Sequence, residues 1–380
     1  MKILHIITSL YDGGAEGVLY RLCCNDKFNK HIVVSLRDKG KYGQLFLNNN
    51  IKIYCLEMKP RRFSIFSLLK LIKILKFEKA DIVQTWLYHS DFFGSIAAKL
   101  AGVKNLIWNI RNSDFIFEDK KKSLIILVKI LAKLSYILPR KIIFCSKNAI
   151  KIHEKLGYDK KKLIYIANGY DLKKFRPSIN QKLIFRKKFN INKNLPILGN
   201  VARFQPHKDH KNLLKALYLL KKDQVLFKCF LVGFKINKQN KILNKLIKKF
   251  KLRREIIFLG PQNNINKFMN GIDVHILASK YGEGFPNVVG EAMASGTPCV
   301  VTNVGDTREI VKKTGWVVPP NNSIKLSKGI KAALENYETN NWNNLCINAR
   351  KRIKYNFSIN NMIENYRKVW KSNLSSCDTN

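Results

Sequence analysis

Two glutamates in the second half of the chain have a spacing that could bind a sugar and a phosphate together. Glu283 and Glu291 stand eight positions apart after the apolar run Val274–Leu277, in the segment Glu283–Pro298, where Gly296 suits the residue just past the end of a helix. A short apolar run bounded by turn residues predicts a strand. We therefore expect Glu283 in the loop after that strand and Glu291 on the following helix. The plain alternative is one helix-capping carboxylate and one solvated carboxylate.

The residues between these glutamates favour a ligand site. Gly284 lets a backbone approach a ligand closely, and Pro286 suits the first turn of the expected helix. Unpaired amides at the start of a helix attract anions. A carboxylate beside such amides can hold sugar hydroxyls while the amides hold a diphosphate. The expected donor-binding set is Gly284, Phe285, Pro286, Asn287, Val288 and Glu291.

Two cations follow another predicted strand. Arg203 and Lys208 come directly after the apolar run Ile197–Val201. A planar guanidinium and a point cation at this spacing can neutralise a leaving diphosphate. The alternative is a pair of solvated cations in a lysine-rich chain.

The first half of the chain carries weaker signals. Gly13 and Gly14 follow the apolar run Ile3–Ile7 and would open a helix, where backbone amides can reach a phosphate or a hydroxyl. A tight turn is the alternative, and the missing G-x-G-x-x-G spacing argues against a dinucleotide cofactor. His89 stands just past another predicted strand, and both a direct role and a structural role remain open for it.

The elements that must position these residues form two alternating series. Short apolar runs separated by helical segments predict parallel strands with helices on both faces of a sheet. The fold class is therefore α/β, with two Rossmann-like doubly wound domains facing a central cleft. We expect domains at residues 1–176 and 177–357, with a polar hinge near Phe175–Asn194. Residues 358–380 should form a helix that packs back on the first domain and ends in a frayed tail from Ser372.

Motifs along most of the chain resemble those of group 1 (family 4) retaining glycosyltransferases, which have the GT-B fold. The glutamates of the Glu283–Pro298 segment stand in the E-x7-E spacing of the family's donor site. Three further motifs keep the family's order, namely G-G-x-E at Gly13–Glu16, N-G-x-D-x3-F-x-P at Asn168–Pro177 and R-x4-K at Arg203–Lys208.

The resemblance implies transfer of a sugar from a nucleotide-sugar donor to a glycan or lipid-linked acceptor, with retention, in polysaccharide or lipopolysaccharide biosynthesis. It implies that the first domain binds the acceptor and the second binds the nucleotide sugar. Glu283, Arg203 and Lys208 would be catalytic. Glu283 would hold the donor sugar's hydroxyls and Glu291 the nucleotide ribose.

The same resemblance leaves the acceptor side incomplete. Gly13, Gly14 and His89 are the expected acceptor-side residues, but the histidine that some family members carry after the next strand is missing, and Arg111 or Asn112 stands near that place. We expect no cofactor and no metal, because cations at the diphosphate site would do the metal's work.

The net charge of +44, with 70 Lys and Arg against 26 Asp and Glu, indicates anionic partners without naming one. A nucleic acid, an anionic membrane surface and drift in an A/T-rich genome are the alternatives, and of these partners we expect the membrane surface and no nucleic acid. No signal peptide is expected at the amino terminus. Eight cysteines without metal-ligand spacing favour a reducing compartment. A cytoplasmic protein, peripheral on the inner face of the cytoplasmic membrane, is therefore our expectation.

Two lysine-interrupted apolar stretches could serve that membrane surface. One predicted helix places Ile65, Leu68, Ile72 and Leu75 on a face, and another does so with leucines from Leu124 to Leu138. Basic amphipathic helices can lie in an anionic interface, although ordinary core helices explain each stretch alone. A sugar-nucleotide epimerase on the same fold, or a basic nucleic-acid-binding protein, remain alternatives for the function.

Overall fold

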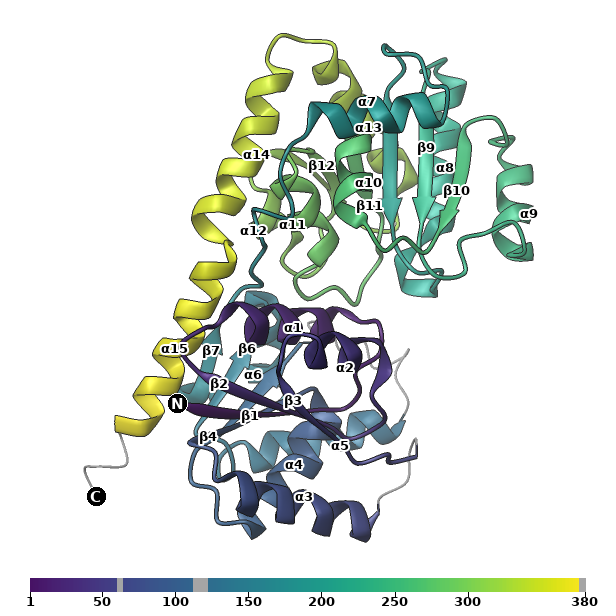
Figure 1. The fold of residues 1–380 in the computed structure, drawn as a ribbon. Helices are drawn as coiled ribbons and strands as arrows, with labels where there is room; N and C mark the ends of the chain where they lie inside the picture. The colour runs from purple at the N-terminus through teal and green to yellow at the C-terminus, as the bar shows by residue number, and fades with distance from the viewer. Residues whose placement is uncertain (60–63, 112–121, 376–380) are drawn as a thin grey trace. The chain divides into compact units, whose positions relative to one another are not determined.

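The computed structural model describes residues 1–59, 64–111 and 122–375 (Figure 1). It divides into two compact units, Met1–Gly169 with Ile359–Asn380 and Tyr170–Ser358. Each unit contains one parallel sheet with helices packed against it, which confirms the predicted pair of α/β domains. Two-sided apolar strands form such sheets because both faces are buried under helices.

Unit 1 is built on seven strands in the order β3-β2-β1-β4-β5-β6-β7. The strands are β1 (Lys2–Ile7), β2 (Lys30–Ser35), β3 (Lys52–Cys55), β4 (Ile82–Trp86), β5 (Leu106–Ile110), β6 (Lys141–Phe144) and β7 (Leu163–Tyr165). The helices are α1 (Gly14–Asn25), α2 (Gly40–Leu47), α3 (Ile65–Glu78), α4 (Tyr88–Leu100), α5 (Lys122–Leu134), α6 (Lys147–Lys155) and α15 (Ile359–Ser375).

The helices of unit 1 cover the two faces of its sheet separately. One apolar cluster joins the sheet to α3, α4, α5 and α6, with Trp108 and Leu131 fully buried in it. A second cluster joins the opposite face to α1, α2 and α15, with Trp86 and Trp370 fully buried. Side chains alternate across each strand, so one sheet supplies both cores.

Helix α15 packs on unit 1, as the sequence predicts. Trp370 Nε1 donates to Gln84 Oε1 at 2.8 Å, and Asn109 Nδ2 donates to Tyr366 Oη at 2.7 Å. The expected fraying from Ser372 is wrong as far as Ser375, because the helix continues to that residue. Asn373 is buried near its end, and Arg140 donates to the Asn373 carbonyl at 3.1 Å.

Unit 2 is built on six strands in the order β10-β9-β8-β11-β12-β13. The strands are β8 (Ile197–Val201), β9 (Lys228–Val232), β10 (Ile256–Gly260), β11 (Val274–Leu277), β12 (Cys299–Thr302) and β13 (Gly315–Val318). The helices are α7 (Ile179–Lys188), α8 (His210–Lys222), α9 (Lys241–Lys249), α10 (Ile265–Gly271), α11 (Asn287–Ala294), α12 (Thr307–Val311), α13 (Ser323–Tyr337) and α14 (Trp342–Asn356).

The boundary between the units differs from the expected one after residue 176. Tyr170 already belongs to unit 2, because its amide donates to the Phe357 carbonyl at 3.0 Å and it forms a parallel bridge with Ser358. The polar stretch expected as a hinge contains α7 instead. Ser178 caps this helix, and the Phe185 ring packs edge-on against Phe230, with 5.0 Å between ring centroids.

Among the described residues, no helix is both long enough and apolar enough to cross a membrane.

Candidate active site

In each sheet the chain adds strands toward one edge first and then toward the other, and the place between the two series is the topological switch point. Open α/β sheets bind ligands at this point, beyond the carboxyl ends of the strands. In unit 2 this switch point lies between the neighbouring strands β8 and β11. The loop after β8 carries Arg203 and Lys208, and the loop after β11 carries Glu283. The topology thus brings two separately predicted segments to the same edge of the sheet.

Lys208 and Glu283 form an ion pair at this edge. Lys208 Nζ lies 2.5 Å from Glu283 Oε1, and the two side chains are only 16% and 9% exposed. Ser279 Oγ donates to the same oxygen at 2.6 Å. The backbone joins the two loops as well, because the Lys280 amide donates to the His207 carbonyl at 2.8 Å.

A short turn fixes the position of Lys208. Residues Pro206–Lys208 form one 3-10 turn, and Asp209 follows in the left-handed conformation with a φ of 46°. Aspartate is one of the few residues that adopts this conformation at low cost. Asp209 then caps α8 by accepting from the Asn212 amide at 3.1 Å. The sharp turn between strand and helix leaves Lys208 pointing toward the β11 loop.

The ion pair determines the charge of Glu283. Burial alone would raise the pKa of this carboxyl group, but the charge and hydrogen bond of Lys208, together with Ser279, hold the pKa below its usual value. Glu283 is therefore ionised at neutral pH and accepts hydrogen bonds without donating any. Such a group suits the binding of sugar hydroxyls better than proton donation.

Helix α11 begins beside this pair. Pro286 stands immediately before the helix, with φ −66° and ψ 113°, so its expected place in the first helical turn is wrong by one position. Asn287 and Val288 are the first helical residues. Pro286, in the N-cap position, has no side-chain oxygen and makes no capping hydrogen bond. The start of α11 is therefore compatible with the predicted anion site.

The rest of the glutamate segment is held by close packing. Phe285 is buried and meets Phe357 edge-on, with ring centroids 5.2 Å apart. A Cβ at Gly290 would lie 2.1 Å from the Tyr170 ring, so α11 contacts the N-G-x-D segment directly at this glycine. Glu291 is half-buried on α11, on the helix where the sequence places it.

A glycine that the sequence reasoning did not single out supports the Glu283 loop. Gly305 has a φ of 55°, and a Cβ at this position would lie 2.0 Å from the Glu283 carbonyl oxygen. The next amide, that of Asp306, donates to the Gly284 carbonyl at 3.0 Å. Only a glycine allows the β12–α12 loop this close to the Glu283 backbone.

Arg203 lies in the same loop as Lys208 but makes different contacts. Its side chain is exposed, and within the described ranges it forms no hydrogen bond or ion pair. Its backbone is held against Gly233, where a Cβ would lie 2.1 Å from the Ala202 carbonyl oxygen. The guanidinium therefore stands at the sheet edge, and no described residue is a partner that a ligand would have to displace.

The N-G-x-D segment spans the boundary between the units. Asn168 is buried in unit 1 and accepts a hydrogen bond from Arg111. In unit 2, Asp171 Oδ1 accepts from the amides of Lys173 and Lys174 at 2.8 and 3.0 Å and so closes a turn. Arg350 donates to the Phe175 carbonyl at 2.7 Å.

Unit 1 has its own switch point, between β1 and β4. Gly13 and Gly14 stand at the start of α1 after β1, and His89 is the second residue of α4 after β4. Thr8 Oγ1 lies 3.0 Å from Ser90 Oγ, which joins these two loops. The three expected acceptor-side residues therefore share one sheet edge.

Gly13 and Gly14 both have structural roles within unit 1. A Cβ at Gly13 would lie 2.2 Å from Glu16 Oε2, so the missing side chain leaves room for this buried carboxylate. The tight-turn interpretation therefore accounts for Gly13, while Gly14 contributes the first residue of α1.

The backbone is strained two positions before His89. Leu87 has φ 75° and ψ 150°, a region that residues other than glycine rarely adopt and that clusters at functional sites. Two backbone hydrogen bonds hold it, from Leu87 N to the Asn109 carbonyl at 3.1 Å and from Asp91 N to the Leu87 carbonyl at 2.9 Å. Loss of hydration, and then the charge of Arg37, lower the pKa of His89, so the ring is neutral at pH 7.

Arg111, one of the two residues expected near the place of the missing histidine, directly follows β5. Its guanidinium lies 5.6 Å from the centre of the Trp86 ring, and Nη1 donates to Asn109 Oδ1 at 3.4 Å. Arg111 is thus anchored within unit 1. Asn112, the other candidate for this place, lies outside the described residues.

One cluster has metal-ligand chemistry but does not fit a metal. Within the described part of the chain, only His5, Cys23 and His31 bring three ligand atoms within 4.8 Å of one another. Trp86 donates to His5 Nδ1 at 3.2 Å, so His5 Nε2 carries its proton and donates to His31 Nδ1 at 3.0 Å. His31 Nε2 then donates to Asp26 at 3.2 Å. Hydrogen bonds use all four ring nitrogens, and a metal would have to break them.

Comparison with known proteins gives this geometry a context. The family model "Glycosyl transferases group 1" matches residues 181–354, and "Glycosyltransferase Family 4" matches residues 13–174. The chain is 25% identical to the UDP-Gal:alpha-D-GlcNAc-diphosphoundecaprenol alpha-1,3-galactosyltransferase of Escherichia coli, over 97% of this chain and 96% of the relative. It is 29% identical to the N,N'-diacetylbacillosaminyl-diphospho-undecaprenol alpha-1,3-N-acetylgalactosaminyltransferase of Campylobacter jejuni, over 81% and 83%.

Solved structures share the fold along nearly the whole chain. HepE of Anabaena, solved in complex with UDP, superposes with a TM-score of 0.86 at 21% identity and covers 98% of this chain and 100% of its own. A glycosyltransferase from Rickettsia africae gives a TM-score of 0.83 at 23% identity, over 98% of both chains. The two family models together match most of both units, and the E. coli relative aligns with 97% of the chain. The chain belongs to the group 1 glycosyltransferases.

Proposed function

We propose that this glycosyltransferase moves a sugar from a nucleotide-sugar donor to a lipid-linked glycan during the synthesis of a surface polysaccharide. The E. coli and C. jejuni relatives are both named for acceptors linked to diphosphoundecaprenol or diphospho-undecaprenol. Another relative is named as a capsular polysaccharide biosynthesis glycosyltransferase of Staphylococcus aureus. The bound UDP of HepE supports a nucleotide donor.

The ion pair of Lys208 and Glu283 at the unit 2 switch point carries this proposal. Glycosyl transfer breaks the bond between the anomeric carbon and a diphosphate oxygen, and negative charge grows on that oxygen. Arg203, Lys208 and the amides at the start of α11 would stabilise this charge. Glu283 would accept hydrogen bonds from the donor sugar, and Glu291 from the nucleotide ribose.

Lys208 has two tasks in this scheme. Without a donor, its charge keeps Glu283 ionised in a nearly dry position. With a donor, a diphosphate oxygen would share the ammonium group, which has three hydrogen-bond donors. One cation thus links the sugar-binding carboxylate to the leaving group.

We further propose that the reaction retains the anomeric configuration and requires no metal. The family resemblance supports retention. Two side-chain cations and a helix start at the diphosphate position support metal independence, since they supply the charge stabilisation that a divalent ion would otherwise provide.

We place the acceptor at the switch point of unit 1, with Gly13, Gly14 and His89 at its edge, and we place the protein on the inner face of the cytoplasmic membrane. The shared sheet edge of these three residues supports the first placement. The lipid-linked acceptors named for the relatives support the second. The neutral His89 ring could accept a proton from an attacking hydroxyl.

A thermal-shift screen of nucleoside diphosphates and nucleotide sugars tests the donor side. A ligand at 100 times its Kd stabilises the folded protein by about 2.7 kcal/mol, so one nucleotide series should raise the Tm clearly. Glu291→Gln should weaken this response. The matched control is Glu335→Gln, which makes the same change on an exposed position of α13 and should leave the response intact.

Product analysis tests the reaction itself. A nuclear magnetic resonance spectrum of the glycoside should show the anomeric configuration of the donor. Inversion would contradict retention. Conversion of the nucleotide sugar into an epimer, without transfer, would favour the epimerase alternative.

A further inference from the structure

The outer faces of α3 and α5 in unit 1 carry apolar side chains that their core contacts leave unused. Helix α3 buries Leu68, Leu71, Ile74 and Leu75 against the sheet cluster. Its opposite side exposes Phe66, Leu69 and Phe77, of which Phe66 is 81% and Phe77 74% exposed. A helix that serves only the core has polar residues on its outer side, so core packing does not explain this second apolar stripe.

Helix α5 repeats this arrangement. It buries Val128 and Leu131, and it exposes Ile126 and Ile130 on its outer side. Ile137, just past the end of the helix, is 72% exposed. The sequence-based expectation for α3 is corrected in one respect, because Ile65 is exposed and does not lie on the buried face with Leu68.

Lysines stand between these apolar residues, and no acidic residue does. The exposed side chains on the outer stripes include Lys73 and Lys76 on α3, and Lys129 and Lys133 on α5. The two carboxylates within α3, α4 and α5 are Glu78 and Asp91, and both are buried. The outer surface of the three helices is therefore apolar and cationic with no compensating negative charge.

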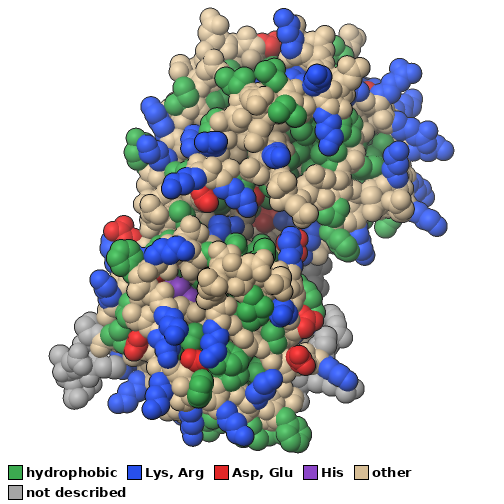
Figure 2. Space-filling view, in the orientation of Figure 1, with side chains coloured by type: hydrophobic (Ala, Val, Ile, Leu, Met, Phe, Trp, Pro, Cys, Tyr) green, Lys and Arg blue, Asp and Glu red, His purple; other side chains and the backbone are tan. Residues whose placement is uncertain are grey.

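The three helices lie side by side. Helix α4 packs against α3 on one side and α5 on the other, and all three cover the same sheet face. Leu100 at the end of α4 is 58% exposed. Figure 2 shows lysine and apolar side chains together along the lower edge of this unit, where Figure 1 draws α3. We call this surface the α3–α5 face.

We propose that the α3–α5 face docks on an anionic lipid bilayer, with Phe66, Leu69, Phe77, Ile126, Ile130 and Ile137 inserted among the headgroups. Exposed aromatic and aliphatic side chains supply the apolar area, and the interleaved lysines supply attraction to anionic lipid headgroups. A nucleic-acid partner would favour cations without large exposed apolar groups.

The geometry of the sheet gives this docking a consequence for the acceptor. Helices α3 and α5 each follow a strand, so each begins near the carboxyl edge of the sheet, where Gly13 and His89 lie. With both helices lying in the interface, the carboxyl edge of the sheet would stand next to the headgroups, where the head of a lipid-linked acceptor could reach it. Docking deepens the proposed place of the protein on the membrane, and this consequence rests in addition on the proposed lipid-linked acceptor.

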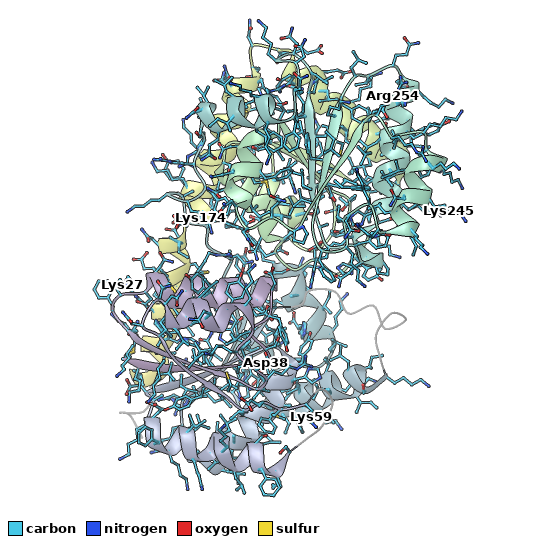
Figure 3. All side chains as sticks on the ribbon, turned by 45° about the vertical axis from the view of Figure 1, so that its right-hand side comes forward. Lys27, Asp38, Lys59, Lys174, Lys245 and Arg254 are labelled. Carbon is cyan, nitrogen blue, oxygen red and sulfur yellow. The ribbon has the colours of Figure 1, made fainter. Side chains whose placement is uncertain are left out.

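The first experiment compares two quadruple variants with the same loss of charge. One replaces Lys73, Lys76, Lys129 and Lys133 with glutamine. The control replaces Lys241, Lys245, Lys248 and Lys249, which are exposed on α9 of unit 2. Lys245 is labelled in Figure 3, at the outer edge of that unit. Binding is measured by co-sedimentation with phosphatidylglycerol vesicles at 150 mM salt.

Each lysine near an anionic surface strengthens binding by a factor of about five. The first variant should therefore bind roughly 600-fold more weakly than the native chain, and the α9 variant should bind much as the native chain does. Equal losses in both variants would show that net charge alone drives binding and would overturn the proposal. Native protein that fails to bind vesicles, or that binds nucleic acid with sub-micromolar affinity instead, would overturn it as well.

The second experiment tests insertion directly. Phe66→Trp should show emission that brominated acyl chains quench, whereas Ile179→Trp, at a position of unit 2 that is also 81% exposed, should not. Equal quenching of both tryptophans, or of neither, would contradict the docking face. Nucleotide-induced thermal shifts of the same variants should equal the native ones, so failure of docking and failure of the proposed transferase function give different results.

Discussion

Removal of Lys208 should separate the stability of unit 2 from its catalysis. In Lys208→Ala, Glu283 keeps its buried position but loses the cation that lies 2.5 Å away. Breaking a buried ion pair by removing one partner costs about 3 kcal/mol or more. For a unit of this size, each kcal/mol lowers the Tm by roughly 2–4 °C. We therefore expect the Tm of unit 2 to fall by roughly 6–12 °C.

This loss should depend on pH in a way that identifies its cause. In the native chain the pKa of Glu283 is lowered, so the carboxylate contributes stability above its unfolded pKa of about 4.3, and this contribution disappears as the pH falls. In Lys208→Ala, burial dominates and the pKa rises, so the carboxylate destabilises the variant at neutral pH and stops doing so once it is protonated. The Tm difference between the two proteins should therefore shrink from pH 7 to pH 4.

Two further variants complete the test. Lys208→Ala with Glu283→Gln should regain stability to within about 1 kcal/mol of native, because no uncompensated charge remains, yet it should stay inactive. Lys331→Ala is the matched control, since its partner Asp223 lies 3.9 Å away on the surface and such pairs contribute about 0–1 kcal/mol. Differential scanning calorimetry measures all four proteins. A Tm of Lys208→Ala within about 1 °C of native would refute the reasoning.

The remaining predictions concern the leaving group, the loop support, metals and pH. Arg203→Ala should lower kcat at least 100-fold with an unchanged Tm, because the exposed guanidinium stabilises only the departing diphosphate; near-native kcat would remove it from the site. Gly305→Ala should cost about 2 kcal/mol or more and weaken donor binding, because a Cβ would meet the Glu283 carbonyl oxygen; isothermal titration with the nucleotide measures the effect, and native affinity would contradict it. Activity should survive exhaustive chelation, and loss reversed by manganese would show a metal requirement. Burial lowers the pKa of His153 and His210 to about 4 and that of His275 to about 3, so the unfolded chain binds the extra protons below pH 6.5 and each histidine should lower the free energy of unfolding by about 1.4 kcal/mol per pH unit down to its folded pKa. Urea titrations from pH 7 to pH 5 should show this slope, and a flat profile would contradict it.

Several features of the site follow from local sequence. Apolar runs such as Val274–Leu277 specify strands that are buried on both faces, and the loops after them must then lie at the carboxyl edge of a parallel sheet. This reasoning places Glu283, Lys208 and Arg203 at the correct edge. The apolar stripe of the last helix likewise predicts its burial, and Tyr366 and Trp370 are fully buried.

Other features of the fold give weak local signals. Strand β13 and helices α13 and α14 were not identified from the sequence. Lysine and asparagine separate the apolar residues of the two helices, whereas β13 is only four residues long. The start of α11 was misplaced by one residue, because proline is compatible with both the position before a helix and its first turn.

What the sequence determined by itself is the class of the strongly patterned elements and the buried stripe of the last helix, because backbone periodicity is a local property. Only the tertiary structure decided which distant residues meet. The pairing of Lys208 with Glu283 spans 75 positions, and it arises because β8 and β11 are neighbours in the sheet. The tertiary structure also decided why position 305 must be a glycine, because its backbone contacts the Glu283 carbonyl oxygen. The second apolar stripe of α3 also depends on the fold, because only the packed sheet shows which of two apolar faces remains exposed.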